Sequence, residues 1–302
     1  MQAALGTNGY DQFTQIRYSD YYLGSLRSGY SGDYEYVAFV GTPVATGSWL
    51  LQIGGHHNAQ NYHYTGNTLN TATPYFLGVE PTSFTYSGGT YTPLAAQRNG
   101  MYNLINSLTA AQLSSAKLTS SFSDVYLGPG SDARSKFPTG TDDRGILASK
   151  LTSDQQALVT TAISAWTKNN PLASTYDALY ASELSQTYVA YSGTTTFANQ
   201  GDYVRIDGPH VWIEFVCQNG VVVSGQIHYH TIWRDRVTDY NAAYGFSPTS
   251  SAGAARSVPK SSSGSFGYAS TQSGAPSPLQ QVADAVASAA TTATKWLLGL
   301  WN

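Results

Sequence analysis

The stretch YVRIDGPHVWIEFVCQNGVVVSGQIHYHTIWRD, residues 203–235, decides the fold of this chain. The runs Tyr203–Ile206, Val211–Val216 and Val221–His230 are rich in Tyr, Val, Ile and Trp with a period of two, and Gly, Pro and Asn separate them. Alternation with a period of two between turn residues predicts β-strands. The first two runs meet at Asp207–Gly208–Pro209, which predicts a hairpin. An antiparallel sheet is therefore expected in the second half of the chain.

The rest of the chain adds strands at its start and helices in its middle. Strand-like runs occur at Tyr34–Val40 and Trp49–Ile53, and helical patterns occur near 101–118 and 149–168, with a third near 171–185. A helical segment between two groups of strands favours an α+β fold over a strictly alternating one. We expect a mixed, mostly antiparallel sheet with helices on one side.

Two of these helices carry a recognisable start signal. Thr109 precedes Gln112 by three residues, and Thr152 precedes Gln155 by the same spacing. In a capping box the hydroxyl accepts the amide at the third helical position, and the glutamine reaches back to the cap amide. Both sites predict helix N-termini.

The composition changes after Gly245. Residues 1–246 are expected to form a single α+β domain, residues 247–278 a flexible connector rich in Ser, Gly and Pro, and residues 279–302 a C-terminal amphipathic helix. This tail helix is expected to dock on its own body or on a partner subunit.

Charge and hydropathy narrow the class of protein. Only 11% of the 302 residues are charged, the net charge is −3, and no run of Lys or Arg occurs. These features exclude a nucleic-acid-binding surface, and no apolar stretch is long enough for a transmembrane helix. A low charge content is typical of proteins outside the cell, so we expect a secreted or extracytoplasmic protein whose signal has been removed before Met1.

The single cysteine, Cys217, is expected to be a buried small hydrophobe.

Five of the six histidines fall in two short clusters, namely His56, His57 and His63 in the first and His228 and His230 in the second. Residues two apart on a strand share a face, so His228 and His230 present two imidazoles side by side. Adding His56 or His57 gives a three-nitrogen site with one open position, which suits one zinc or copper ion, with iron possible. His63 is a candidate fourth ligand, or a residue that contacts a ligand without binding the metal itself.

Two other interpretations of the histidines stay open. They could form a metal-free acid–base or binding site, or they could each satisfy a structural hydrogen bond.

Two glutamates are candidates for proton transfer. Glu214 lies between Ile213 and Phe215 in an expected core strand, where a carboxylate must be paired or functional. It could pair with Arg205 across the hairpin, or act as a general base or carboxylate ligand. Glu80, in a loop-like stretch, could carry a proton or be a solvated loop carboxylate.

Arg234 and Asp235 follow the second histidine cluster closely in the chain. Arg234 could hold an anionic group of a substrate. Asp235 could orient a ligand imidazole through its second nitrogen.

Four blocks together resemble a mainly bacterial family that is defined as domain of unknown function 3500, over roughly residues 10–246. The blocks are Gly54–His57, Pro74–Pro81, Tyr203–Phe215 and His228–Asp235. The resemblance implies that they belong to one domain and that the tail beyond Gly245 is an addition. It implies no settled reaction.

The sequence thus predicts a secreted metal-dependent enzyme. Metal-activated water would attack a bond of a small-molecule or polymer substrate, possibly an anionic one, while Glu214 or Glu80 moves the proton. The alternatives are an extracellular copper or iron oxidoreductase and a metal-free binding or assembly protein.

Overall fold

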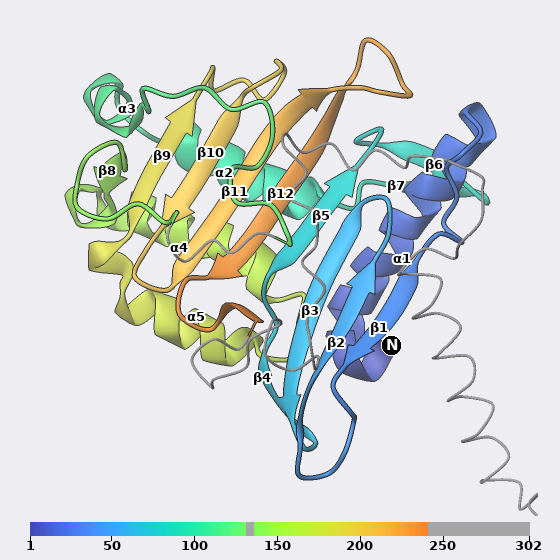
Figure 1. Ribbon diagram of the computed structural model, residues 1–302. Coiled ribbons are helices and arrows are strands. Elements are labelled where there is room, and N and C mark those ends of the chain that lie inside the picture. The colour runs from blue at the N-terminus through green and yellow to red at the C-terminus, as the bar shows by residue number, and fades with distance from the viewer. Residues whose placement is uncertain (131–135, 241–302) are drawn as a thin grey trace, which may run out of the picture.

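The computed structural model describes residues 1–130 and 136–240 (Figure 1). The expected boundary at residue 246, the connector 247–278 and the tail helix 279–302 lie outside the described residues. The helices in chain order are α1 (Gln2–Leu26), α2 (Ala95–Asn106), α3 (Ala110–Ala116), α4 (Ser153–Thr167) and α5 (Ala173–Ser182). None of the helices in the described ranges is both long and apolar enough to cross a membrane.

The strands form one large antiparallel sheet and one separate hairpin. They are β1 (Tyr36–Val40), β2 (Ser48–Gly54), β3 (Asn58–Thr65), β4 (Thr68–Thr71), β5 (Tyr75–Val79), β6 (Phe84–Tyr86), β7 (Gly89–Tyr91), β8 (Ile146–Leu147), β9 (Tyr188–Ser192), β10 (Tyr203–Asp207), β11 (Val211–Asn219) and β12 (Ile227–Asp235). The large sheet has the order β1-β2-β3-β5-β12-β11-β10-β9-β8, with β4 paired to β3, and β6 pairs with β7. The α+β prediction with a mostly antiparallel sheet is confirmed.

Strand β5 joins the two halves of the chain. It pairs with β3 on one side and with β12 on the other, so that Gly78 lies opposite His230. The amide of Gly78 also donates to the carbonyl of His57 at 2.8 Å. This topology brings the two histidine clusters, about 170 residues apart in sequence, to neighbouring strands.

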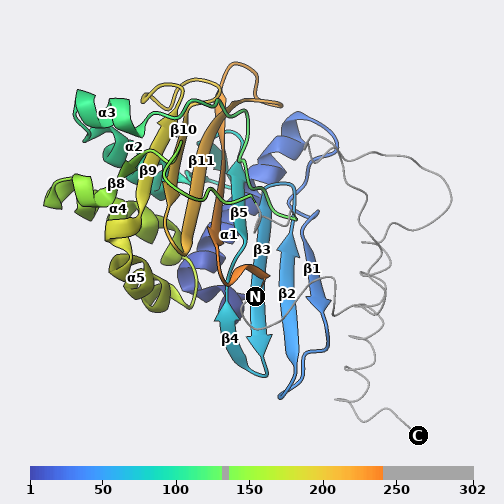
Figure 2. The ribbon, with the colours of Figure 1, turned by 60° about the vertical axis from the view of Figure 1, so that its left-hand side comes forward.

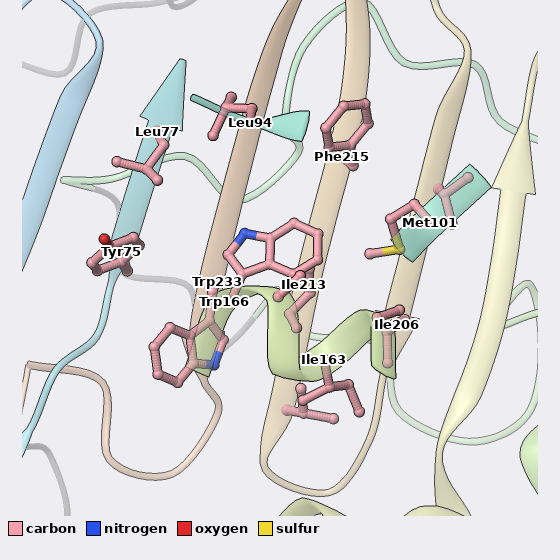
Figure 3. Close-up of a cluster of buried hydrophobic side chains, with 14 of the residues drawn as sticks. Tyr75, Leu77, Leu94, Met101, Ile163, Trp166, Ile206, Ile213, Phe215 and Trp233 are labelled. Atoms are coloured by element: carbon pink, nitrogen blue, oxygen red, sulfur yellow. The ribbon is translucent and has the colours of Figure 1, made fainter. Parts of the chain in front are cut away.

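The helices pack on one face of the sheet, as Figures 1 and 2 show. Helix α4 is fixed to β12 by a hydrogen bond of 2.9 Å from Trp166 Nε1 to Thr231 Oγ1. Between them lies a core of large buried side chains that includes Trp166, Trp233, Ile213 and Phe215 (Figure 3). Helix α1 packs on the same side and contacts β3 and β5.

The other face of β9–β12 is covered by a long connection between α3 and β8, which Figure 1 shows in green in front of these strands. Its residues Leu118 and Leu127 are buried against the sheet, the first with Tyr203 and Val216 and the second with Trp212. The connection therefore reaches both β10 and β11 on the face opposite to the helices.

The helix starts are confirmed, but one expected helix is divided in two. Thr109 and Thr152 both form capping boxes. Because Thr109 begins α3, the helix expected over 101–118 is interrupted at 107–109, and α2 itself starts at Ala95.

The strand expected at Val221–His230 is also displaced, to Ile227–Asp235. The amide of Gly220 donates to the carbonyl of Gln226 at 2.7 Å, and Gly225 has a φ of +78°, a value that favours glycine. Residues 220–226 are therefore a loop despite their run of valines.

Candidate metal centre

Three imidazoles meet where β3, β5 and β12 adjoin. The ring centroids of His228 and His230 are 4.9 Å apart, and His57 lies 6.3 Å from the first and 5.6 Å from the second. Gly78 makes room for them, because a Cβ there would lie 2.9 Å from His230 Cδ2 and closer still to the His57 ring. The two histidine clusters therefore converge.

Two of these imidazoles each have a carboxylate oxygen close to the Nδ1 atom. Asp20 Oδ1 lies 3.2 Å from His57 Nδ1, and Asp124 Oδ1 lies 2.9 Å from His230 Nδ1. Gln218 Nε2 is a second neighbour of His230 Nδ1, at 3.2 Å. A proton on Nδ1 that is donated to the carboxylate leaves the lone pair of Nε2 free for a metal ion.

His56 lies next to His57, with 4.1 Å between the ring centroids, and Tyr30 packs edge-on against its outer side at 4.7 Å. One ligand atom each of Asp20, His56 and His57 lies within 4.8 Å of the other two. This buried group could hold a metal ion. It contains both histidines between which the sequence left the choice open.

Three imidazoles of the site, those of His56, His57 and His228, have lowered pKa values. Burial, with a smaller contribution from neighbouring imidazoles, lowers the pKa of His56 to about 3 and that of His228 to about 4, and it lowers the pKa of His57 well below its ordinary value. A metal ion binds the neutral form of histidine, so burial prepares these rings as ligands.

Two buried polar atoms of the site, Asp20 Oδ2 and His228 Nδ1, make no hydrogen bond within the described ranges. Burial raises the pKa of Asp20 to about 7, against a smaller lowering by His56. Burial and then the Asp20 charge raise the pKa of Glu35 to about 8. Arg17 and a hydrogen bond from Asn58 lower the pKa of Glu35, but by less than burial raises it.

Glu80 lies at the edge of the histidine group and is buried, with 2% of its surface exposed. Its Oε1 accepts the amides of Val222 and Val223 at 2.7 and 2.8 Å. Its charge acts on both His56 and His228. It is thus not a solvated loop carboxylate, because it anchors the β11–β12 loop beside the imidazoles.

The structure does not bring His63 into this group. It lies six positions along the chain from His57, a separation of about 20 Å on an extended strand. Its ring nitrogen Nε2 lies 2.7 Å from Ser48 Oγ, and Nδ1 lies 3.3 Å from Asn70 Nδ2. A structural role fits His63 better than metal binding.

Glu214 and Arg205 are cross-strand neighbours, as expected, but their contacts point to packing. The fully buried Glu214 accepts hydrogen bonds from Trp212 Nε1, Tyr203 Oη and the amides of Tyr126 and Leu127. Arg205 donates from Nη2 to the Asp143 carbonyl and lies over the Trp212 ring. Through the hydrogen bonds from the amides of Tyr126 and Leu127, Glu214 attaches the connection between α3 and β8 to the sheet. This connection contains Asp124.

Arg234 and Asp235 lie at the far end of β12, about 13 Å or more along the strand from His230. Arg234 is fully buried, and its Nε lies 2.9 Å from Asp239 Oδ2. Asp235 accepts the amides of Val237 and Thr238 and so closes the turn after the strand. Neither residue reaches the imidazoles or an open surface.

Three carboxylates of the site, Asp20, Glu35 and Asp124, were not found from the sequence. Asp20 belongs to a helix that the residue pattern did not predict, and Asp124 lies in an irregular connection. The available signal was weak, namely that acids are few in a chain with 11% charged residues.

Fold and site together define an α+β protein with a buried histidine–carboxylate group where the two halves of an antiparallel sheet meet. The chain belongs to the family described as protein of unknown function (DUF3500), whose model matches residues 1–242. This match confirms the resemblance seen in the sequence. No curated protein and no solved structure matches the chain.

Proposed function

We propose that this protein is a metal-dependent hydrolase in which His57, His228 and His230 bind one transition metal ion. The observation that carries the proposal is the pair of carboxylates, Asp20 and Asp124, on the Nδ1 atoms of two of these rings. Carboxylates in this position are the usual partners of metal-binding histidines, because they fix the tautomer and the ring orientation.

The spacing of the rings supports a shared ion. Zinc binds imidazole nitrogen at about 2.0–2.1 Å, which sets ring centroids about 5 Å apart around one tetrahedral ion. The centroid distances are 4.9, 5.6 and 6.3 Å, so His57 and His228 would have to move closer together to bind one ion.

A second set of ligands, Asp20, His56 and His57, competes with this one for the same ion. We favour the three histidines because Asp20 already occupies Nδ1 of His57, whereas His228 is 2% exposed and its Nδ1 has no partner in the described part of the chain. A buried ring nitrogen that makes no hydrogen bond is available to a metal ion.

Three neutral nitrogen ligands leave an open position for water on zinc, and an ion at such a site lowers the pKa of its water into the neutral range. Glu80 is our candidate for moving the proton, since it lies at the edge of the site and uses only Oε1 for the two loop amides. The substrate is proposed to be a small molecule or polymer, and the protein is proposed to act outside the cytoplasm.

Elemental analysis of protein purified without chelator tests the proposal. We expect about one zinc per chain to be lost in His228→Ala/His230→Ala and kept in His210→Ala. His210 is a suitable control because it lies apart from the cluster and pairs with Glu183. A double variant that keeps its zinc and its activity would disprove the three-histidine site.

The same measurement covers the second candidate, a copper or iron oxidoreductase. That candidate is favoured by the group's nitrogen and oxygen donors, which also suit Cu(II). Bound copper with a paramagnetic signal would favour the oxidoreductase over the hydrolase. Protein that contains no metal would favour a binding or assembly role.

A further inference from the structure

An open hollow of about 430 Å³ lies at the end of the sheet away from the histidines. Its lining includes two arginines and three side chains with other polar groups, namely Arg144, Arg236, Ser185, Gln186 and Tyr188. Arg236 follows the last residue of β12, whereas His230 lies near the start of that strand. The volume falls in the range of small-molecule pockets, about 300 to 1,000 Å³.

Two guanidinium groups beside this hollow share one carboxylate. Arg144 donates from Nε and Nη2 to the two oxygens of Asp207 at 2.7 and 3.0 Å, and Arg236 donates from Nη1 to Oδ1 at 2.7 Å. The Asp207 side chain is fully buried, while those of Arg144 and Arg236 are 12% and 15% exposed. One negative charge therefore offsets two positive charges, and both positive groups reach the surface of the hollow.

Neighbouring charges add to this positive excess. Burial is the largest cause of the lowered pKa of Arg236, Asp207 opposes it, and the charges of Arg144 and Arg205 lower the pKa further. Glu183 is an acid close in sequence to the lining, but it accepts hydrogen bonds from the amide and the ring of His210. The excess therefore comes from three guanidinium groups around one buried carboxylate.

The two arginines of the hollow also have donors to spare. Each makes three hydrogen bonds with described residues, to Asp207 and to main-chain carbonyls. A guanidinium carries five N–H groups, so each arginine keeps at least two that bond to no described residue. The Arg144 guanidinium lies over the Tyr188 ring, 4.2 Å from its centroid, and this contact limits its movement.

We propose that this hollow binds a small molecule through an oxyanion group, that is, a carboxylate, sulfate or phosphate. Paired guanidinium groups recognise such groups because their N–H donors match the spacing of the oxygens. Arg144 and Arg236 would hold the oxyanion, and the exposed Ser185 and Gln186 would contact the rest of the ligand. This binding site is additional to the proposed metal centre, and neither depends on the other.

Calorimetric titration of the full chain tests the proposal with three probes, sodium sulfate, sodium phosphate and sodium glucuronate, at an ionic strength kept constant with sodium chloride. We expect saturable binding of at least one probe, with one site per chain, and none of glucose. The probe that binds most tightly identifies the kind of oxyanion. Binding of none of the three, or equal binding of glucose and glucuronate as the only ligands, would overturn the proposal.

Gln186→Glu is the decisive variant, because it places a negative charge at the hollow on an exposed side chain and leaves the Asp207 pairs intact. Repulsion of the oxyanion should weaken binding by about tenfold or more. Gln2→Glu makes the same change on the exposed start of α1 and should bind as the wild type does. Equal affinity in Gln186→Glu and Gln2→Glu would place the bound anion elsewhere and contradict the proposal.

His228→Ala/His230→Ala separates this site from the metal centre. The double variant should bind the oxyanion with wild-type affinity, whether or not it has lost zinc. If the anion instead bound only to protein with intact histidines, it would be a ligand of the metal centre, and the site at Arg144 and Arg236 would be wrong.

Discussion

Buried carboxylates in two regions of this molecule have opposite surroundings. In the β10–β11 region, Glu214 and Asp202 are almost fully buried, and every one of their oxygens accepts at least one hydrogen bond. Beside the histidines, Asp20 Oδ2 has no described donor, and Glu35 has a hydrogen bond only from Asn58 among the described residues. The residue types are the same in both regions, so the type alone does not reveal the role.

The difference teaches how structural and functional acids can be separated. A carboxylate that is satisfied on both oxygens contributes to folding and has no capacity left for a ligand. A buried carboxylate with unsatisfied oxygens destabilises the fold unless it is protonated or binds a cation. The comparison makes predictions that differ between the two regions.

The largest effect is expected for Glu214→Ala. Removing this carboxylate leaves buried donors unpaired, among them Trp212 Nε1 and the amide of Leu127, and should lower the free energy of unfolding by about 3 to 5 kcal/mol. Urea denaturation measures this loss. Zinc stoichiometry of the folded variant should not change. A variant of unchanged stability that has lost its metal would instead place Glu214 in the site.

The next effect concerns Asp124, which contacts the metal centre through His230. Asp124→Asn keeps the shape but removes the charge that orients the imidazole, and such changes weaken metal binding by about 10- to 100-fold. Its side chain is 40% exposed, so stability should change by less than about 1 kcal/mol.

Competition with a coloured chelator gives the zinc affinity of Asp124→Asn. Asp142→Asn, in the same connection, is the control and should bind zinc as the wild type does. Equal affinities in both variants would show that Asp124 does not position His230.

A smaller, pH-dependent effect is expected at Asp202. Burial opposes its ionisation, but hydrogen bonds from Thr194 and from the amides of Asn199 and Ala198 outweigh it and lower its pKa. A lowered folded pKa gives stability that is present above the unfolded pKa near 3.8 and is lost as the pH falls through the folded value.

Asp202→Asn should therefore cost about 1 to 2 kcal/mol at pH 7 and clearly less at pH 3. Urea denaturation of the wild type and the variant at both pH values gives the two differences. The same difference at both pH values would argue that the amide hydrogen bonds do not depend on the charge.

The sequence predicted the elements whose pattern is local. The capping boxes at Thr109 and Thr152 and the hairpin at 207–209 depend on neighbouring residues, and they were confirmed. The pairing of His228 with His230 on one strand followed from the same two-residue period. The convergence of His228 and His230 with the first histidine cluster was inferred from residue type alone.

Two of the elements that the sequence did not predict, α1 and β3, have polar residues at buried positions. Helix α1 buries residues at helical spacing, but these include Gly9, Gln12 and Asp20, so it has no apolar stripe. Strand β3 likewise buries Asn58 and Gln60. Polar residues at these positions serve the site and its surroundings, and tertiary contacts rather than local preference place them.

Strand β5 was missed for a different reason. Residues 75–79 are buried on every position, because the strand lies between β3 and β12, and such a short apolar run has no period that identifies it. It was interpreted as a loop, although it is the strand that brings both histidine clusters together. The convergence of the clusters therefore could not be derived from the pattern, and the partners Asp20 and Asp124 could not be found.

The smallest effect is expected at Cys217, which belongs to the same strand as the satisfied Glu214 but occupies the opposite face. Its register partner is Tyr229, whereas the neighbouring Val216 lies opposite His230, so the thiol points away from the imidazoles. Burial, with a further contribution from Asp202, raises its pKa to about 12, and only about one thiol in 10⁴ is ionised at pH 8. A maleimide should therefore leave the native protein unlabelled for hours and label it fully in guanidinium chloride. Cys217→Ala should bind zinc like the wild type, and weakened binding would mean that the two faces of β11 are not as independent as the structure implies.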